Sequence, residues 1–182
     1  MLKNFINKLR FLYFRCRIRR AGEYEKAPLY AAYYGMKIGK NVRIPALLDV
    51  TGEPYLIEIG DDVTITRNVT LHTHDGGTGL FRKEYPGLNI FGRIKIGNNV
   101  FIGSNTVILP NVTIGNNVVI GTCSVVTKNI PDDVVVAGNP ARVIKTIEEY
   151  KQKVISIGMI VHETDPEKRK QEILQNMAEK DK

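Results

Sequence analysis

The sequence predicts a mainly β protein whose middle part winds short strands into stacked triangular coils, and three observations lead to this prediction. Aliphatic residues recur at every sixth position, small or β-branched residues stand two positions before each of them, and Gly and Asn follow at the strand ends. A period of six combined with an alternation of two fits short strands and excludes one long amphipathic helix, whose period is 3.6 residues. The aliphatic series is Ile96, Ile102, Ile108, Ile114, Ile120 and Val126.

The residues around this series predict how each strand begins and ends. The partners two positions earlier are Ile94, Val100, Thr106, Val112, Val118 and Ser124. Gly follows Ile96, Ile102, Ile114 and Ile120, and Asn is third after Ile96, Ile102, Ile108 and Ile114. Because Gly and Asn tolerate positive φ, we expect the chain to turn a corner after each strand. Three strands and three corners close a coil of eighteen residues, which stacks Gly97 under Gly115 around a column of Ile and Val.

The same pattern starts further upstream and is interrupted twice. Residues 38–50 open a first coil, Gly52–Pro54 is a three-residue insertion, and residues 59–71 form another coil. The count then fails until Ile94, so we expect residues 72–93 to leave the column as an extruded loop. Long loops in compact domains are usually functional or disordered.

Helices are expected at both ends of the stack, where coils need caps. We therefore divide the chain into an N-terminal helical segment (1–35), a β-helix (36–146) and a C-terminal helical tail (147–182). In the tail, Asp165 precedes Pro166 and Glu167, which is typical of a helix start. In the first segment, apolar residues at helical spacing predict an amphipathic helix: Leu2, Phe5, Ile6, Leu9, Leu12, Tyr13 and Cys16.

Composition narrows the class of protein. At 182 residues, 43% hydrophobic and 25% charged, the chain is an ordinary globular protein of about one domain. Residues 1–26 hold eight Lys and Arg and two Glu, which gives +6 of the net charge of +7. The rest of the chain is therefore nearly neutral, and we do not expect it to bind nucleic acid. The basic helix either packs on a neighbouring domain or subunit, which we expect, or makes a weak contact with an anionic membrane through residues 1–20.

The sequence has neither a spanning apolar run nor a signal peptide, and its two cysteines, Cys16 and Cys123, are far apart. We therefore expect a cytoplasmic protein; contact with the inner membrane face stays open.

Histidines point to chemistry where the repeat fails. His72 and His74 lie at the root of the expected loop, and Asp75 follows directly. A histidine can accept a proton near neutral pH, and a nearby carboxylate can fix its tautomer. His74 is thus a candidate general base, oriented by Asp75, with His72 in reserve. The alternatives are ordinary surface histidines or metal ligands, but ligands so close in sequence rarely converge on one ion, and we expect no metal.

At this point the residues carry a resemblance. Phe91–Gly115, Val118–Pro131 and Val136–Ile144 resemble the hexapeptide-repeat O-acetyltransferases, which fold as a left-handed parallel β-helix, and the likeness covers about residues 38–146. Glu53–Gly60, Thr73–Gly77 and Arg82 are similar to the branch found in surface-polysaccharide and lipopolysaccharide biosynthesis. The handedness of the helix is implied by this resemblance alone.

The resemblance implies direct acetyl transfer from acetyl-CoA to a sugar hydroxyl of a surface polysaccharide or its precursor, without a covalent enzyme intermediate, in a homotrimer. By similarity His74 is the base, and Arg82 is a candidate contact for an anionic acceptor. The positions that match coenzyme-binding residues of the family are Ser104, Thr122, Thr127, Lys128 and Arg142.

Other functions stay open from the sequence. The acceptor could instead be small, such as an antibiotic, a galactoside or the nitrogen of an amino sugar. A γ-type carbonic anhydrase shares the β-helix but needs three well-separated histidine ligands, and a β-helix can also be a scaffold without activity.

Overall fold

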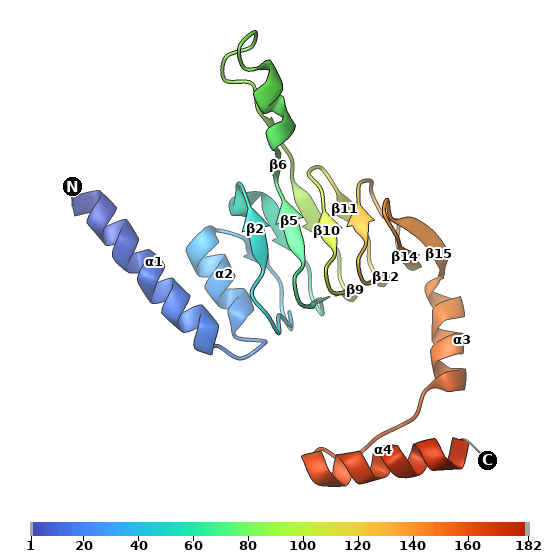
Figure 1. Cartoon of the computed structure of the whole chain (residues 1–182). Coiled ribbons are helices and arrows are strands. Elements are labelled where there is room, and N and C mark those ends of the chain that lie inside the picture. Colours follow the sequence, from blue (N-terminus) through green and yellow to red (C-terminus); the bar gives the residue numbers. More distant parts are fainter. Residues whose placement is uncertain (1, 181–182) are drawn as a thin grey trace. The chain divides into compact units, whose positions relative to one another are not determined.

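The computed structural model describes residues 2–180, which group into two compact units divided after Ile147. The first unit begins with two helices, α1 (Leu2–Arg20) and α2 (Lys26–Tyr34), and continues into a parallel β-helix (Figure 1). The second unit, from Glu148 onward, is helical.

The β-helix has three faces, and each is a parallel sheet built from strands of successive coils. Sheet A contains β1 (Lys37–Ile38), β3 (Ile57–Ile59), β8 (Ile94–Ile96) and β11 (Thr113–Ile114). Sheet B contains β4 (Thr64–Ile65), β9 (Val100–Ile102), β12 (Val118–Ile120), β14 (Val134–Ala137) and, antiparallel, β15 (Arg142–Thr146). Sheet C contains β2 (Asp49–Thr51), β5 (Thr70–His72), β10 (Val107–Ile108) and β13 (Val125–Val126).

The interior is the column that the six-residue period predicts. All six members of the aliphatic series are buried, and so are their partners two positions earlier. The register also agrees, because Ile96 pairs with Ile114 and Ile102 pairs with Ile120 on successive coils. Removing these side chains from water is the main driving force for stacking the coils.

The corners turn through the third residue of each unit. Positive φ is found at Asn41, Asp62, Asn68, Asn99, Asn105, Asn111, Asn117, Cys123 and Asp133. The glycines that precede these residues are not in this region, so our expectation for them was wrong. They are needed because adjacent coils approach closely: a Cβ on Gly97 would lie 2.5 Å from the carbonyl oxygen of Gly115.

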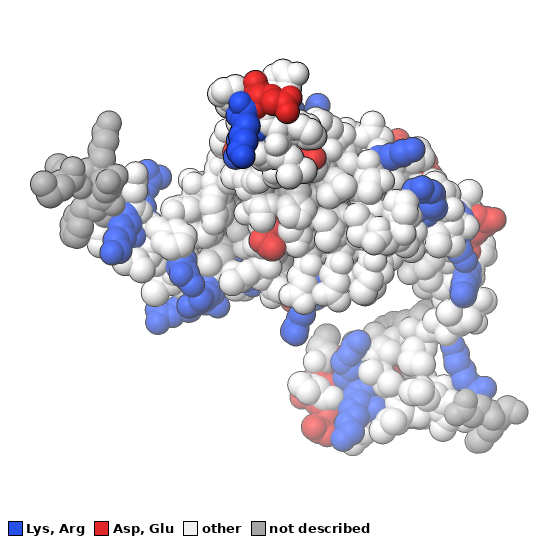
Figure 2. Space-filling model, turned by 45° about the horizontal axis from the view of Figure 1, so that its top comes forward, with Lys and Arg blue, Asp and Glu red and all other residues white. Residues whose placement is uncertain are grey.

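The N-terminal helix forms as expected but packs through other residues. Phe14 and Ile18 are buried in the core, and Phe14 stacks on Tyr33 of α2 with ring centroids 4.2 Å apart. In contrast, Leu9, Leu12 and Tyr13 are more than half exposed, so this part of the expected stripe does not pack within the chain. The side chains of Leu2 and Phe5 lie outside the described residues. Lys and Arg gather around α1, whereas the coils present few charges on the same face (Figure 2).

A hydrogen bond of Tyr30 joins α2 to the first coil. Its hydroxyl accepts a hydrogen bond from the backbone N–H of Leu48 at 2.8 Å, and its side chain is only 3% exposed. Burial raises the pKa of Tyr30 above its usual value, so the hydroxyl is neutral at physiological pH. The start of the β-helix is therefore covered by helices that are bonded to it.

The C-terminal unit contains most of α3 (Ile147–Ile157) and all of α4 (Pro166–Lys180). Asp165 stands directly before α4, as the sequence predicts, and its carboxylate accepts the backbone N–H of Lys168 at 3.1 Å. None of the helices within residues 2–180 combines the length and apolar character needed to cross a bilayer.

Candidate active site

Both interruptions of the repeat occur at the corner that joins sheet C to sheet A. After β2 the chain makes the turn Gly52–Glu53 and a short 3₁₀ helix, η1 (Pro54–Leu56). After β5, one coil further on, it leaves through β6 (His74–Asp75) and the 3₁₀ helix η2 (Gly76–Phe81), and returns through β7 (Ile90–Phe91) (Figure 1). Because β2 and β5 are paired, with Thr51 opposite His72, the two insertions lie next to each other.

His74 meets a carboxylate at this corner, and that carboxylate belongs to Glu53. Nδ1 of His74 lies 3.5 Å from Oε2 of Glu53, and both side chains are partly exposed, by 41% and 25%. The imidazole also lies against Gly52, since a Cβ on that residue would collide with Nδ1. This arrangement directs Nδ1 toward the acid and turns Nε2 away from it.

Thr73 holds the Glu53 turn in place. Its side chain is fully buried, and its hydroxyl accepts the backbone N–H of Glu53 at 2.6 Å. The same hydroxyl lies 3.0 Å from the carbonyl oxygen of Thr51, to which it can donate. The acid beside His74 is thus fixed through its backbone to the neighbouring coil.

The structure gives Asp75 and His72 other partners. Adjacent residues of a strand point to opposite faces, so Asp75 points away from its neighbour His74, and its carboxylate accepts the N–H of Gly77 at 2.8 Å to cap η2. His72 lies at the end of β5, with Nδ1 2.6 Å from the hydroxyl oxygen of Thr51. Of the three candidate catalytic residues, only His74 is beside a carboxylate.

Arg82 ties the extruded loop together. Its Nη2 donates to Oδ1 of Asn89 at 2.8 Å, and its Nε lies 3.4 Å from the carbonyl oxygen of Leu88. These bonds link the outgoing and returning halves of the loop. The guanidinium expected to contact the acceptor is therefore already engaged with the loop itself.

Four of the five candidate coenzyme residues lie along two edges of sheet C, and the fifth, Arg142, lies in sheet B. Ser104 and Thr122 occupy the corner between sheets B and C on successive coils, where the carbonyl oxygen of Ser104 accepts the N–H of Cys123 at 2.8 Å. Thr127 and Lys128 are exposed at the opposite corner, and the register of β5, β10 and β13 puts Thr127 in the same column as His72. Arg142 is exposed at the start of β15.

Sequence reasoning missed three residues of this site: Gly52, Glu53 and Thr73. A signal for them was present, because the insertion at Gly52 falls after the last strand of its coil, as the long loop does. Across residues 2–180, no three His, Cys, Asp or Glu side chains are placed to hold a metal ion.

Comparison with known proteins agrees with this architecture. The family description "Bacterial transferase hexapeptide (six repeats)" matches residues 93–128. Protein CapG of Staphylococcus aureus is 57% identical over 123 residues, which are 66% of this chain and 72% of CapG. The galactoside O-acetyltransferase of Escherichia coli K12 is 43% identical over 67% of this chain and 60% of its own.

A solved structure shares the fold across most of both chains. A galactoside acetyltransferase in complex with coenzyme A has a TM-score of 0.58 and 32% identity, over 81% of this chain and 82% of that one. The chain therefore belongs to the hexapeptide-repeat acetyltransferases, acyltransferases built on a left-handed parallel β-helix.

Proposed function

We propose that this protein transfers the acetyl group of acetyl-CoA to a hydroxyl of a sugar in a surface polysaccharide or its precursor, with His74 as the general base. The observation that carries the proposal is the pairing of His74 with Glu53 where both insertions meet. Relatives named as galactoside acetyltransferases, one of them solved with coenzyme A, support the sugar acceptor and the acetyl donor.

The chemistry follows from the orientation of the imidazole. Glu53 favours the tautomer with its proton on Nδ1, so Nε2 is free to take the proton of the acceptor hydroxyl as its oxygen attacks the thioester carbonyl. The tetrahedral intermediate collapses with breakage of the C–S bond, and the proton on Nε2 passes to the leaving thiolate. The products are the acetyl ester and free coenzyme A, and no bond to the protein forms. Backbone N–H groups at the corners are suited to hold the oxyanion.

The donor site that we propose follows sheet C. Ser104 and Thr122 would flank the pantetheine arm through their backbones, while Thr127, Lys128 and Arg142 would meet the polar end of the coenzyme. Lys128 and Arg142 are exposed cations, which suits phosphate groups. Thr127 also lies in the column that leads to His72 and the loop.

We further propose a homotrimer in which each site is completed by a neighbouring subunit. The extruded loop supports this idea, because it exposes apolar side chains that the chain itself does not cover. Leu80 is 83% exposed, and Phe81 and Tyr85 are each more than half exposed. Burying such residues against a second copy is favourable.

Release of thiol from acetyl-CoA in the presence of sugar acceptors tests the base. We expect His74→Ala to lower kcat by about 10²–10⁴-fold, the usual contribution of a general base. His162→Ala, at a histidine of the C-terminal unit, is the matched control and should behave as wild type. Equal rates for wild type and His74→Ala would reject His74, and the same loss in His72→Ala alone would move the role to His72.

Glu53 is tested through its side chain, since its backbone bond to Thr73 survives substitution. Glu53→Gln should lower kcat about 10–100-fold, or roughly 1.4–2.8 kcal/mol, because it removes the carboxylate charge 3.5 Å from Nδ1 of His74, and it should leave the KM for acetyl-CoA unchanged. Glu53→Asp should recover part of the rate.

A failure of the enzyme to bind acetyl-CoA at all would instead support the alternative that the protein is a scaffold without activity.

A small galactoside is the second candidate acceptor, and the names of the relatives favour it. A free galactoside used as well as a polysaccharide fragment in the same assay would support this alternative.

A further inference from the structure

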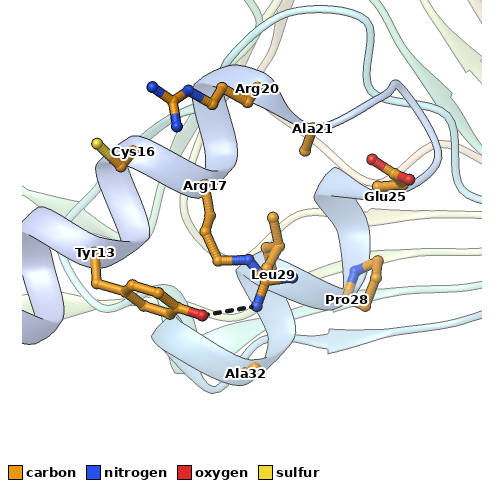
Figure 3. Close-up of a pocket in the computed structure, with 9 residues that line it drawn as sticks. All are labelled: Tyr13, Cys16, Arg17, Arg20, Ala21, Glu25, Pro28, Leu29 and Ala32. Carbon is orange, nitrogen blue, oxygen red and sulfur yellow. Dashed lines mark hydrogen bonds between the residues drawn. The ribbon is translucent and has the colours of Figure 1, made fainter.

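A groove between α1 and α2 leads away from the candidate active site. It consists of three cavities of about 480, 200 and 810 Å³ that share lining residues. Arg10 and Tyr33 line both the first and the second cavity, and Tyr13, Arg17 and Leu29 line both the second and the third. Figure 3 shows the third cavity, where Arg17 extends from α1 toward α2.

The first cavity reaches His74 through a single residue. Gly52 and Pro54 form part of its wall, on either side of Glu53. The imidazole of His74 lies against Gly52, as shown by the collision that a Cβ would cause. Gly52 faces the Nδ1 edge of the imidazole, so a molecule that presents a hydroxyl to Nε2 has to pass around the Gly52–Glu53 turn to enter the groove beside Tyr33 and Tyr34.

The groove is basic and aromatic. Arg10 and Arg17 line it, and no carboxylate among the described side chains lies within ion-pair distance of either guanidinium. The one acid in the wall, Glu25, is occupied in accepting the N–H of Gly22 at 2.8 Å. Arg17 is held over the ring of Tyr13, 5.6 Å from its centroid, and its Nη1 donates to the Tyr13 hydroxyl at 3.3 Å.

We propose that this groove binds the phosphate of the acceptor, so that the preferred acceptor is a glycosyl phosphate rather than a neutral sugar. The inference rests on the proposed function. Arg10 and Arg17 are separated by about two helical turns on one face of α1, and their guanidinium groups match phosphate oxygens in shape and charge. Tyr33 and Tyr34 line the cavity that also holds Arg10 and Gly52, and aromatic side chains are suited to pack against a sugar ring.

Steady-state kinetics with paired acceptors test the proposal. The probes are methyl galactoside, galactose 1-phosphate and a polyprenyl-phosphate-linked galactose in detergent, each with acetyl-CoA. We expect a lower KM for both phosphate acceptors than for the neutral glycoside. Arg10→Gln and Arg17→Gln should each raise the KM of the phosphate acceptors about tenfold, as expected for one charge-assisted bond, with the KM of acetyl-CoA and of methyl galactoside unchanged.

Arg19→Gln is the matched control, because it removes the same charge from another side of α1, where Arg19 lines a different cavity. The proposal is overturned if neutral and phosphate acceptors have equal KM values, or if Arg19→Gln matches the effect of Arg10→Gln. If Arg10→Gln and Arg17→Gln raise the KM equally for the free and the lipid-linked phosphate acceptors, the groove recognises the phosphate itself. If these substitutions raise the KM for the lipid-linked acceptor alone, the groove does not recognise the phosphate that both acceptors share.

A binding measurement separates this inference from the proposed function. Calorimetry of galactose 1-phosphate with His74→Ala, alone and combined with Arg10→Gln, needs no turnover. Weaker binding in the double variant supports the groove even if His74 proves not to be the base. Equal binding in both variants rejects the groove even if His74 is confirmed as the base.

Discussion

Gly52 offers a way to disturb the candidate site without substituting an ionisable residue. It combines a positive φ of 93° with close contact to its neighbours. A Cβ at this position would lie 2.7 Å from Oγ1 of Thr73 and 3.0 Å from Cε1 of His74, and closer still to Nδ1 of His74. Ordinary contacts begin near 3.4 Å, so in Gly52→Ala the imidazole of His74 must move away from residue 52, and the hydroxyl of Thr73 must also give way.

The expected size of the effect has two parts. Withdrawing the imidazole by roughly 1 Å should lower kcat by about 10²-fold, because catalytic groups must be held in a near-attack arrangement. Alanine at a φ of 93° adds about 1–2 kcal/mol of backbone strain. For a chain of this size that strain lowers Tm by about 2–8 °C. The KM for acetyl-CoA should stay as in wild type, since Gly52 lies away from the proposed donor residues.

Thiol release and thermal melting measure these two parts separately. Gly79→Ala is the control, because a Cβ there meets nothing within 4 Å and its φ is not positive. It should keep both wild-type kcat and wild-type Tm. Wild-type kcat in Gly52→Ala would refute the argument that the contact between Gly52 and the imidazole positions the base.

Two further predictions concern the β-helix and its cap. In Gly97→Ala the new Cβ would lie 2.5 Å from the carbonyl oxygen of Gly115 in the next coil. This overpacking should cost about 1–3 kcal/mol of stability and lower the Tm in a thermal melt by several degrees. An unchanged Tm would contradict the close stacking of the coils. Tyr30→Phe leaves the N–H of Leu48 without its partner, and chemical denaturation should show a loss of about 1–3 kcal/mol, whereas Tyr34→Phe serves as the comparison and should lose less.

The fold could be predicted because every coil is stabilised by the same kind of buried contact. Each coil buries the same two inward positions, so one pattern of aliphatic residues specifies all three sheets and their register. The reason for the corner glycines could not be read from one coil, since their constraint is the backbone of the next coil. The packing face of α1 also escaped prediction, because Phe14 and Ile18 are selected by the aromatic surface of α2 rather than by the spacing of apolar residues.

The candidate site could be predicted only in part for a related reason. His74 attracted attention because it stands where the repeat fails. Its acid was sought next to it in the sequence, at Asp75, but alternation along a strand directs neighbours to opposite faces. Glu53 is 21 residues before His74 in the sequence, and it lies next to His74 only because β2 pairs with β5.

A stack of identical coils leaves few places where chemistry can be added. Side chains inside the column fill the core, and those on the faces are spaced by the sheet, so reactive groups can converge only where residues are inserted at a corner. Insertions at different corners would lie on different edges of the prism. Placing the Gly52 turn and the loop at one corner on successive coils brings their side chains within the separation of paired strands, about 4.8 Å. In the proposed mechanism, the rigid repeat supplies the precision that Glu53 needs to orient His74, and the insertions supply the two side chains.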